Sequence, residues 1–458
     1  MSMPLVKHLI KIFSLPAITF IFLMPGIIVP FSAQSQNVRP LSLNETIDMS
    51  LKNSPALKAS SERNIQATTR VRQALDNKLP NINVSGSYLY LANPTISTKA
   101  KALGGGTDSA GNKTAIPHIH QAMYGILNLS LPLYAGGKIR YGIESAKYLE
   151  QAASLDVEKD KESIILNTIN AYVNLYKAEV TVGVIKDNLA QSRHQDSVFS
   201  RLEQNGLLAR NDLLKSELQT SNIELTLLDA ENNLKIANVN MDLMIGLPET
   251  TIIQTDVTEF DKKFSEKTID EYEQLALQNR KDVLALSFRK KAATSGIAIA
   301  RADQYPTLAL TGGYIAANLP HLITITNAVN VGIGIQYNLS FWKSKAQIAE
   351  AKSKEKELIA DETQLTDGIK LHINQDFENY LLSKRKIDVY KKAVAQAEEN
   401  YRITKNKYDN DLVNTSDLLE ANVSVLQSKI NLAVAKADVL LAYSKLLETS
   451  GIIEQTIN

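Results

Sequence analysis

The sequence predicts a mainly α-helical protein that also carries transmembrane β-strands and is internally duplicated. Three observations support this fold class. No proline occurs between Pro132 and Pro248, which allows a very long helical hairpin there. Residues 304–342 contain no aspartate, glutamate, lysine or arginine, and apolar and polar side chains alternate along them. Landmarks of the first half recur in the second half, which indicates a duplicated unit.

Residues 1–35 are predicted to be a secretory signal peptide. A short basic segment precedes an apolar run over residues 12–31, and small side chains follow at Ala33 and Ser35. Cleavage is expected before Gln36, with cleavage directly after Ala33 as an almost equal choice. The alternative is an uncleaved membrane anchor, which the prolines within the apolar run disfavour.

Composition narrows the possible classes of protein. The chain has 458 residues, 22% of them charged, and a formal net charge of +1, so no general basic field for nucleic acid exists. It has no cysteine, which excludes disulfides and a bacterial lipoprotein anchor. After the signal peptide no run reaches the roughly 20 apolar residues of a membrane-spanning helix. Any membrane insertion must therefore use β-strands.

The first half of the chain is predicted to contain three helical segments before its long return helix. Two short helices cover residues 43–52 and 56–77. The long helix covers residues 137–204, and at about 1.5 Å per residue it would span roughly 100 Å. It turns at Asn205-Gly206 and returns through about residue 246. Such lengths are typical of coiled-coil-like packing.

A second long hairpin is predicted near the C-terminus. Its first helix covers residues 343–408, turns near Asn410-Asp411 and returns to about residue 450. The return helix has a coiled-coil seam with alternating spacings of four and three. The seam residues are Leu419, Val423, Leu426, Ile430, Ala433, Ala437, Leu440, Ser444 and Leu447. The glutamates and lysines of the long helices are expected to form a solvated face with i, i+4 pairs.

Two strands are predicted between the short helices and the first long helix. Alternation with period two begins at Asn81 and again near Ile119, and residues 95–117 between them are predicted to form a loop. In each strand, one face is apolar and the other is polar. The apolar residues are Ile82, Val84, Tyr88 and Tyr90, and then Met123, Leu127, Leu129, Leu131 and Leu133.

The second pair of strands gives the clearest pattern. The odd-numbered residues from Ile323 to Leu339 are predicted to face lipid, and polar residues such as Asn330 and Gln336 to face water. The alternative is a half-buried strand of a soluble sheet, but such strands usually carry some charge. Four strands cannot close a barrel, and open edges are not tolerated in lipid. Several chains must then contribute strands.

The duplication divides the mature chain, residues 36–458. The first repeat covers about residues 41–246 and the second about residues 268–451, with an irregular linker at 247–267. The matched residues include Asn53 with Asn279, Pro80 with Pro306, Gly86 with Gly312, Tyr88 with Tyr314, Tyr172 with Phe377 and Gly246 with Gly451.

The chain resembles the TolC-like outer membrane efflux protein family over nearly all of residues 40–451. The segments that carry the resemblance are weak singly but specific in this order and twice over. They are Leu41 to Ile47, Asn53-Ser54-Pro55, Leu79-Pro80, Pro132-Leu133-Tyr134, Gly136-Gly137, Gly206, Asp212-Leu213-Leu214 and Gly246-Leu247-Pro248. One departure is residues 338–341, which replace the proline-containing strand exit in the second copy.

The resemblance implies a homotrimer in the outer membrane. Four strands per chain would build a 12-stranded β-barrel in outer-membrane lipid, and the helices would build a periplasmic α-barrel continuous with it. Such proteins are passive exit ducts of tripartite efflux or type I secretion systems. The implied partners are a periplasmic adaptor, or membrane fusion protein, and an inner-membrane pump of the RND or ABC type.

The two hairpin tips are predicted to dock the adaptor, because they are the points farthest from the barrel. They cover residues 203–211 and 410–416. The docking residues are predicted to be Gly206, Leu207, Asp411 and Leu412. Gly206 would allow the tight reversal. The alternative is that each tip is only a turn.

The resemblance also implies a pore gate near the second hairpin, formed by a tyrosine, an arginine and two acidic residues. Tyr408 matches the tyrosine, and Asp417 and Glu420 fall on the acids, while Val413 stands where the arginine would be. Asp417 and Glu420 share a helical face, so three chains would form a ring of carboxylates that attracts cations. The alternative is that Asp417 only stabilises the start of its helix.

The sequence contains no recognisable enzyme site and implies no cofactor. It has no glycine-rich phosphate loop, nucleophile elbow or zinc signature. His118 and His120 could share one side of a strand, but they are interpreted as polar residues near a barrel rim and not as metal ligands. The alternative to a duct is a secreted or surface coiled-coil protein, structural or adaptor-like, without channel activity.

Overall fold

The computed structural model describes residues 38–92, 120–262, 264–320, 323–337 and 339–454. The signal peptide, most of the first predicted loop and His118 lie outside these residues. Among the described residues, no helix is both long and apolar enough to cross a membrane.

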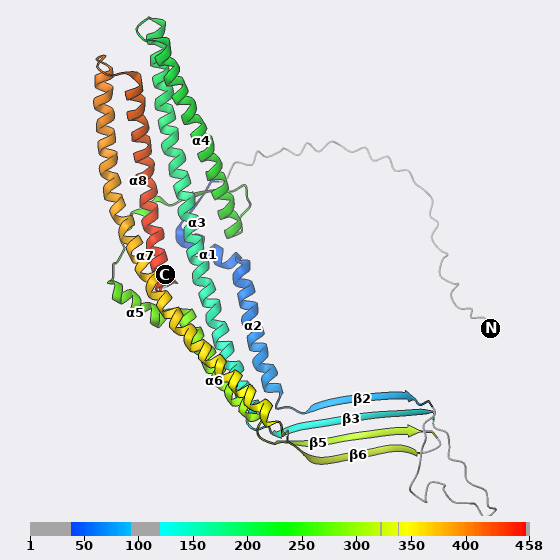
Figure 1. Ribbon diagram of the computed structural model, residues 1–458. Helices are drawn as coiled ribbons and strands as arrows, with labels where there is room; N and C mark the ends of the chain where they lie inside the picture. The colour runs from blue at the N-terminus through cyan, green and yellow to red at the C-terminus, as the bar shows by residue number, and fades with distance from the viewer. Residues whose placement is uncertain (1–37, 93–119, 263, 321–322, 338, 455–458) are drawn as a thin grey trace, which may run out of the picture. The chain divides into compact units, whose positions relative to one another are not determined.

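The same order of elements occurs twice along the chain, as Figure 1 shows. The first series is α1 (Leu43–Asn53), α2 (Pro55–Asp76), β2 (Asn81–Tyr90), β3 (Gln121–Tyr134), α3 (Lys138–Gln204) and α4 (Arg210–Ile245). The second is α5 (Ile269–Asn279), α6 (Lys281–Ala302), β5 (Thr307–Leu319), β6 (Ile323–Gln336), α7 (Phe341–Tyr408) and α8 (Thr415–Thr449). The predicted long hairpins are confirmed almost to the residue.

Local side chains begin the short helices in both series. The hydroxyl of Ser42 accepts a hydrogen bond from the Glu45 N–H and caps α1. Thr268 caps α5 in the same way. The Thr268 N–H in turn donates to the Glu271 carboxylate, which completes a capping box. Pro55 occupies the first turn of α2, where its missing N–H costs nothing.

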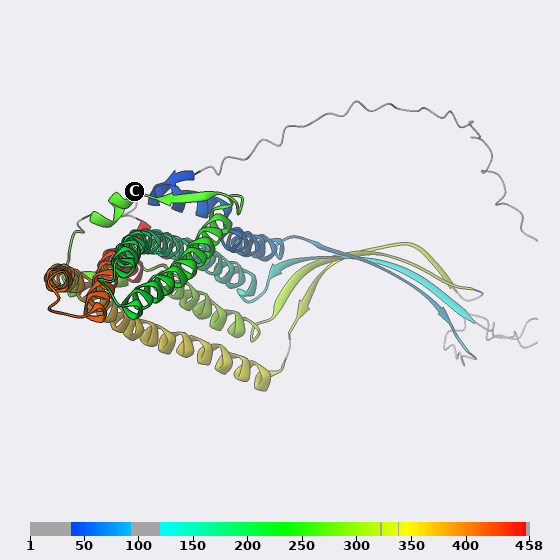
Figure 2. The same ribbon diagram turned by 90° about the horizontal axis from the view of Figure 1, so that it is seen from above.

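The four long strands form one antiparallel sheet in the order β2-β3-β5-β6, bent and twisted along its length (Figure 2). The registers bring most of the predicted apolar residues of β2, β3 and β6 onto one face, together with alternate residues of β5. Leu133 is an exception, because a register shift between Pro132 and Tyr134 puts Tyr134 beside Leu308 in its place. Along one row, for example, Val84 lies beside Leu127, Leu127 beside Tyr314 and Tyr314 beside Val329. We call this the apolar face and its opposite the polar face. The predicted strand faces are confirmed here.

The prediction is wrong at the outer end of β6. A β-bulge places Thr326 and Asn327 together opposite β5, with Ala328 beside Ile315 but Ile325 beside Ala317. Asn327 has a φ of 58°, a left-handed conformation that asparagine tolerates better than most residues. The extra residue reverses the alternation, so Ile323 and Ile325 lie on the polar face. The odd-numbered residues therefore do not all share one face.

A second sheet was not predicted. The segments β1 (Val38–Leu41) and β4 (Ile252–Thr255) form a parallel pair, and a short 3₁₀ helix, η2 (Val257–Asp261), follows. The linker is thus not irregular throughout. The buried hydroxyl of Tyr172 on α3 joins this pair, because it donates to the Leu41 carbonyl at 2.9 Å and accepts from the Asp256 N–H at 2.7 Å.

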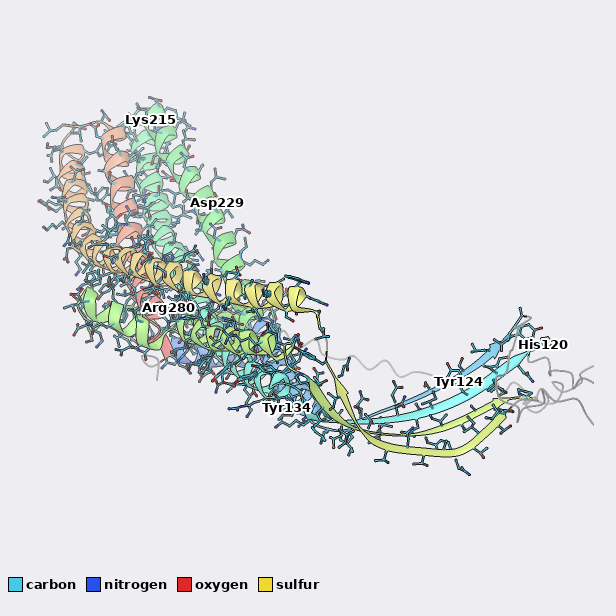
Figure 3. The ribbon with its side chains drawn as sticks, turned by 60° about the horizontal axis from the view of Figure 1, so that its bottom comes forward. His120, Tyr124, Tyr134, Lys215, Asp229 and Arg280 are labelled. Atoms are coloured by element: carbon cyan, nitrogen blue, oxygen red, sulfur yellow. The ribbon has the colours of Figure 1, made fainter. Side chains whose placement is uncertain are left out.

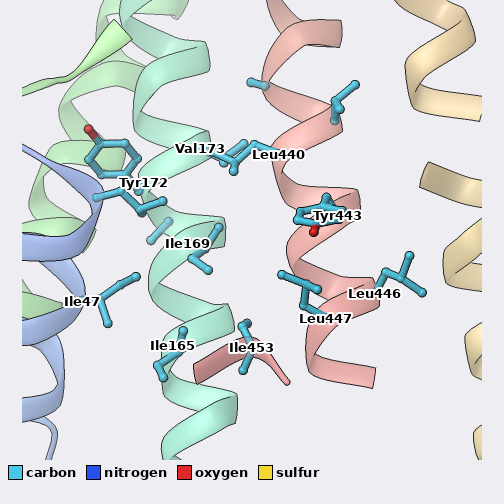
Figure 4. Packing of buried hydrophobic residues seen from close by; sticks show 14 of the residues in the cluster. Ile47, Ile165, Ile169, Tyr172, Val173, Leu440, Tyr443, Leu446, Leu447 and Ile453 are labelled. Atoms are coloured by element: carbon cyan, nitrogen blue, oxygen red, sulfur yellow. The ribbon is translucent and has the colours of Figure 1, made fainter. Parts of the chain in front are cut away.

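The main hydrophobic core lies where α3 and α8 pack together with α1 and β4 (Figure 4). Side chains from α3 and α8 face each other across it, which joins the two long hairpins within one chain. The fully buried residues of this core include Ile47, Ile169, Tyr172, Leu175, Met241, Ile245 and Ile453.

Candidate functional site

The two hairpin tips have the same backbone geometry. Gly206 ends α3 in the left-handed conformation, with a φ of 71°, and Asp411 does so after α7, with a φ of 59°. In both tips the next residue, Leu207 or Leu412, donates its N–H back to the carbonyl five residues earlier. These bonds form a Schellman motif, which closes the helix end and points the chain back.

Each tip exposes one leucine. Leu207 is 74% exposed and Leu412 is 72% exposed. Neither packs into a hydrophobic cluster of the chain as described. Single exposed leucines are common on protein surfaces, so docking at Leu207 and Leu412 stays a prediction.

A small hydrophobic cluster holds the two tips beside each other. Phe199, Leu213 and Leu418 are buried together, and Tyr408 packs against them. The ring of Tyr408 stacks on that of Phe199 with 5.5 Å between centroids. Sequence reasoning missed this cluster, although Leu213 and Leu418 occupy matched positions in the two repeats.

Tyr408, predicted as a gate residue, is bound within its own chain. Its hydroxyl accepts a hydrogen bond from the Thr415 hydroxyl at 3.4 Å, across the tip. Burial raises the pKa of Tyr408, so the phenol stays neutral. Among the described residues it makes no hydrogen bond to Asp417 or Glu420, and the gate stays a prediction.

Asp417 helps to begin its helix, as the alternative interpretation expected. Its N–H donates to the Asn414 side chain at 3.0 Å, and its carboxylate accepts from the Asn414 N–H at 3.3 Å. This is a capping box. Glu420 is exposed one turn further along. Both acidic side chains are thus exposed at this tip.

The first tip lacks this double negative charge. Ala209 precedes α4 and offers no side-chain cap. Asp212 is neutralised by Lys215, whose ammonium lies 3.3 Å from its carboxylate. Lys215 occupies the position that Glu420 has in the second tip.

Buried polar side chains fix how the long helices pack, and sequence reasoning missed them. On α3, Asp196 accepts hydrogen bonds from the hydroxyls of Ser216 and Thr220 on α4. Farther along, the buried amides of Asn188 on α3 and Asn422 on α8 form a 3.0 Å hydrogen bond. Polar pairs inside a helical interface specify its register.

One buried acid departs from the predicted solvated face. Glu162 on α3 is 5% exposed and makes no ion pair within the described residues. Burial raises the pKa of Glu162 to about 7, partly offset by the nearby charge of Lys281. Arg280, labelled in Figure 3, forms a two-pronged ion pair with Asp282 close by and also donates to the Thr449 carbonyl at the end of α8.

The sheet carries the other part of the candidate site. Figure 3 shows Tyr124 and His120 toward one end of β3 and Tyr134 at the other end, next to the helices. No aspartate, glutamate, lysine or arginine occurs within β2, β3, β5 or β6. An apolar face without charge suits contact with lipid, and an uncharged polar face suits contact with water.

No catalytic or metal centre accompanies these features. Among the described residues, no group of three or more histidine, cysteine or acidic side chains is placed to hold a metal ion. The prediction that His118 and His120 are not metal ligands stays a prediction, because His118 lies outside the described residues.

Comparison with known proteins gives a consistent picture. A family model described as outer membrane efflux protein matches residues 46–247 and 273–451. Outer membrane protein TolC of Escherichia coli K12 is 21% identical over 93% of this chain and 84% of its own length. TolC of Salmonella enteritidis is 23% identical, but that match spans only 64% of this chain and 62% of the relative.

Solved structures share the fold. The outer membrane protein VceC from Vibrio cholerae superposes with a TM-score of 0.72 and 20% identity, covering 89% of this chain and 96% of that one. A membrane protein from Pseudomonas aeruginosa superposes with a TM-score of 0.75 and 16% identity, covering 89% and 92%.

Proposed function

We propose, from the premise that the chain belongs to the outer membrane efflux protein family, that it is the outer-membrane channel of a tripartite efflux or type I secretion system. The observation that carries this proposal is the charge-free sheet, whose aligned apolar face leads directly into helical hairpins about 100 Å long. One part suits a membrane and the other suits a passage through the periplasm.

Three copies would complete the duct. The outer strands β2 and β6 each leave one edge without a partner strand in the described chain, and unpaired backbone groups are costly in lipid. Pairing β2 of one copy with β6 of the next would give a 12-stranded barrel. Its polar face would line a water-filled lumen, and the long hairpins would form the α-barrel below it.

The two tips are the proposed docking site for a periplasmic adaptor, which in turn would connect to an inner-membrane pump of the RND or ABC type. Gly206 and Asp411 set the two turns, and Leu207 and Leu412 are the exposed apolar contacts. Leu207→Arg with Leu412→Arg should abolish efflux while trimers still form and insert. Full efflux in that double variant would refute docking at these leucines.

The acids of the second tip are the proposed gate. Asp417 and Glu420 from three copies would surround the periplasmic entrance, and Tyr408 would lie at the same tip. Such a ring would favour cations over anions. Within one chain the observed packing partners of Tyr408 are Phe199, Leu213 and Leu418, so its part in the gate is proposed from its place at this tip.

Fractionation tests the proposal against a secreted coiled-coil protein without channel activity. We expect the mature protein in the outer-membrane fraction, as a heat-modifiable species of about three times the 50.5 kDa chain mass. A protein that stays soluble and monomeric without detergent would refute the channel.

A further inference from the structure

The polar face of the sheet is divided into two zones along its length. Near the helices it is polar, with Asn81, Asn83, Ser130, Thr311 and Gln336. From the row of Ile126 and Ile315 outward, apolar side chains of β3, β5 and β6 predominate on this face, with Ser85, Ser87 and Tyr124 among them. We call these apolar residues the collar: Ile126, Ile315, Ala317, Leu319, Ile323 and Ile325.

The bulge adds Ile323 and Ile325 to the collar, whereas its β3 and β5 residues lie on this face by regular alternation. Without the extra residue, Ile323 and Ile325 would share the apolar face with Val329. Tyr314 fixes the bulge, because its hydroxyl donates to the Asn327 side chain at 3.1 Å and accepts from the Asn327 N–H at 3.4 Å. On the apolar face beyond the bulge, Thr324 and Asn318 form a 3.2 Å hydrogen bond. Polarity is thus exchanged between the two faces in β5 and β6, while Tyr88 and Met123 remain on the apolar face in β2 and β3.

Next to the collar lies a row of amide side chains. Asn83, Asn128 and Asn330 occupy neighbouring positions across the sheet, with Gly313 between the last two. A side chain at Gly313 would lie 3.3 Å from the Asn330 carboxamide oxygen and 3.5 Å from that of Asn128. The glycine therefore leaves space in which the two amides converge. All three amides are exposed, and they make no hydrogen bond within the described residues.

We propose that the collar and the amide row together bind uncharged amphipathic solutes. The apolar part of the solute lies on the collar, and its hydrogen-bonding group reaches the amides. Along β5, the collar residues Ile315 and Ala317 lie roughly 7 Å and roughly 13 Å from Gly313, at about 3.3 Å per residue. The strands offer no charged side chain, so an ionised solute gains no ion pair there and loses hydration. The site rests on the proposed function, because this face is a lumen only in a closed barrel.

The absence of cysteine makes single-cysteine reporters specific. Ala317→Cys lies in the collar, and Val331→Cys lies on the apolar face. In the full-length protein, matured and reconstituted as trimers in nanodiscs, we expect a membrane-impermeant maleimide to label Ala317→Cys and to leave Val331→Cys unlabelled. If both positions react equally, the sheet is not in lipid and the proposed function fails.

The probe is 1-adamantanecarboxamide, an uncharged apolar cage with one amide, and 1-adamantanecarboxylate is its charged control. We expect the carboxamide to slow labelling of Ala317→Cys saturably and the carboxylate to have little effect. Adding Asn330→Ala should weaken this protection about fivefold, the value of one neutral hydrogen bond. Adding Ile325→Ser should also weaken it, while Val331→Ser, a matched change on the opposite face, should not.

Two results overturn the site and leave the channel intact. One is a labelled Ala317→Cys whose rate does not respond to the carboxamide, with Val331→Cys still unlabelled. The other is equal protection by the carboxylate, which would show unspecific adsorption. Because Asn330→Ala could disturb assembly, Asn128→Ala provides a second test of the amide row, and only variants that form heat-modifiable trimers are compared.

Discussion

The two hairpin tips share a backbone and differ in chemistry. Both place a left-handed residue before an exposed leucine, but the first uses Gly206 with the neutralised pair Asp212 and Lys215. The second uses Asp411 and keeps two unpaired acidic charges. The turn geometry is thus maintained by backbone hydrogen bonds, while charge is free to diverge. At the tips, the two copies therefore differ in charge and not in the geometry of the turn.

The same comparison applies farther from the tips. Tyr172 binds the β1–β4 pair with its hydroxyl, and its counterpart Phe377 has none. Glu162 is buried, whereas Asp367 at the matched position is exposed. Each pair allows a variant in one copy to be judged against the other.

The largest effect is expected in the sheet, where the bulge separates two zones of β6. Ile333→Arg would place a charge in hydrocarbon and should cost about 2–4 kcal/mol near the midplane. Gln336→Arg, on the polar face, should be tolerated, and so should Ile325→Arg if the bulge reverses the faces as described. The yield of heat-modifiable trimers measures all three. Equal loss for Ile325→Arg and Ile333→Arg would show that the bulge is misplaced.

Glu162 should make the first copy sensitive to pH. Its pKa of about 7 in the folded chain is above the usual value for a glutamate. Folding therefore favours the protonated form, and stability is full at low pH and falls as pH rises through about 7. Glu162→Gln should remove this dependence and stabilise the protein at pH 8 by on the order of 2 kcal/mol. Thermal unfolding at pH 5 and pH 8 measures it. Asp367→Asn is the matched control and should have no such effect.

Tyr172→Phe gives the first repeat the residue that the second repeat has at the matched position, Phe377. The change would leave the buried Leu41 carbonyl and Asp256 N–H without their partner, at a cost of about 1–2 kcal/mol. Denaturant unfolding measures the loss. Phe260, which packs against Tyr172, should become more mobile. Unchanged stability would mean that water replaces the hydroxyl and that the β1–β4 pair does not depend on it.

The smallest effect concerns the helix caps at the tips. Asn414→Ala should destabilise the second tip by about 1 kcal/mol, because the capping box is lost. Ala209→Asn should stabilise the first tip by a similar amount, because α4 begins without a side-chain cap. The rate of amide hydrogen exchange in the first turns of α4 and α8 measures the effect of each variant. No change in either tip would show that the Schellman turns alone hold the helix ends.

The features that sequence predicted are those with a regular period. The absence of proline predicted α3, the heptad-like spacing predicted α8, and alternation predicted most of the strand faces. Asn327 is the one polar side chain at an odd-numbered position between Ile323 and Ile335, and this break in the alternation was not interpreted as a bulge. The pair β1 and β4 was missed because each strand has only four residues and its partner is distant in sequence. Glu162 was expected on a solvated face because it is a charged residue of a long helix. Its burial depends on how α3 packs in three dimensions, which the sequence pattern does not show.

Ion flow tests the account most directly. Mature protein reconstituted in planar lipid bilayers should give discrete, cation-selective current steps that multivalent cations block from the periplasmic side. Asp417→Asn with Glu420→Gln should weaken both selectivity and block without disturbing the trimer, and Asp212→Asn in the first tip should leave them unchanged. Unaltered selectivity in the double variant would remove the gate from the second tip. Inserted trimers that never conduct would contradict the channel itself.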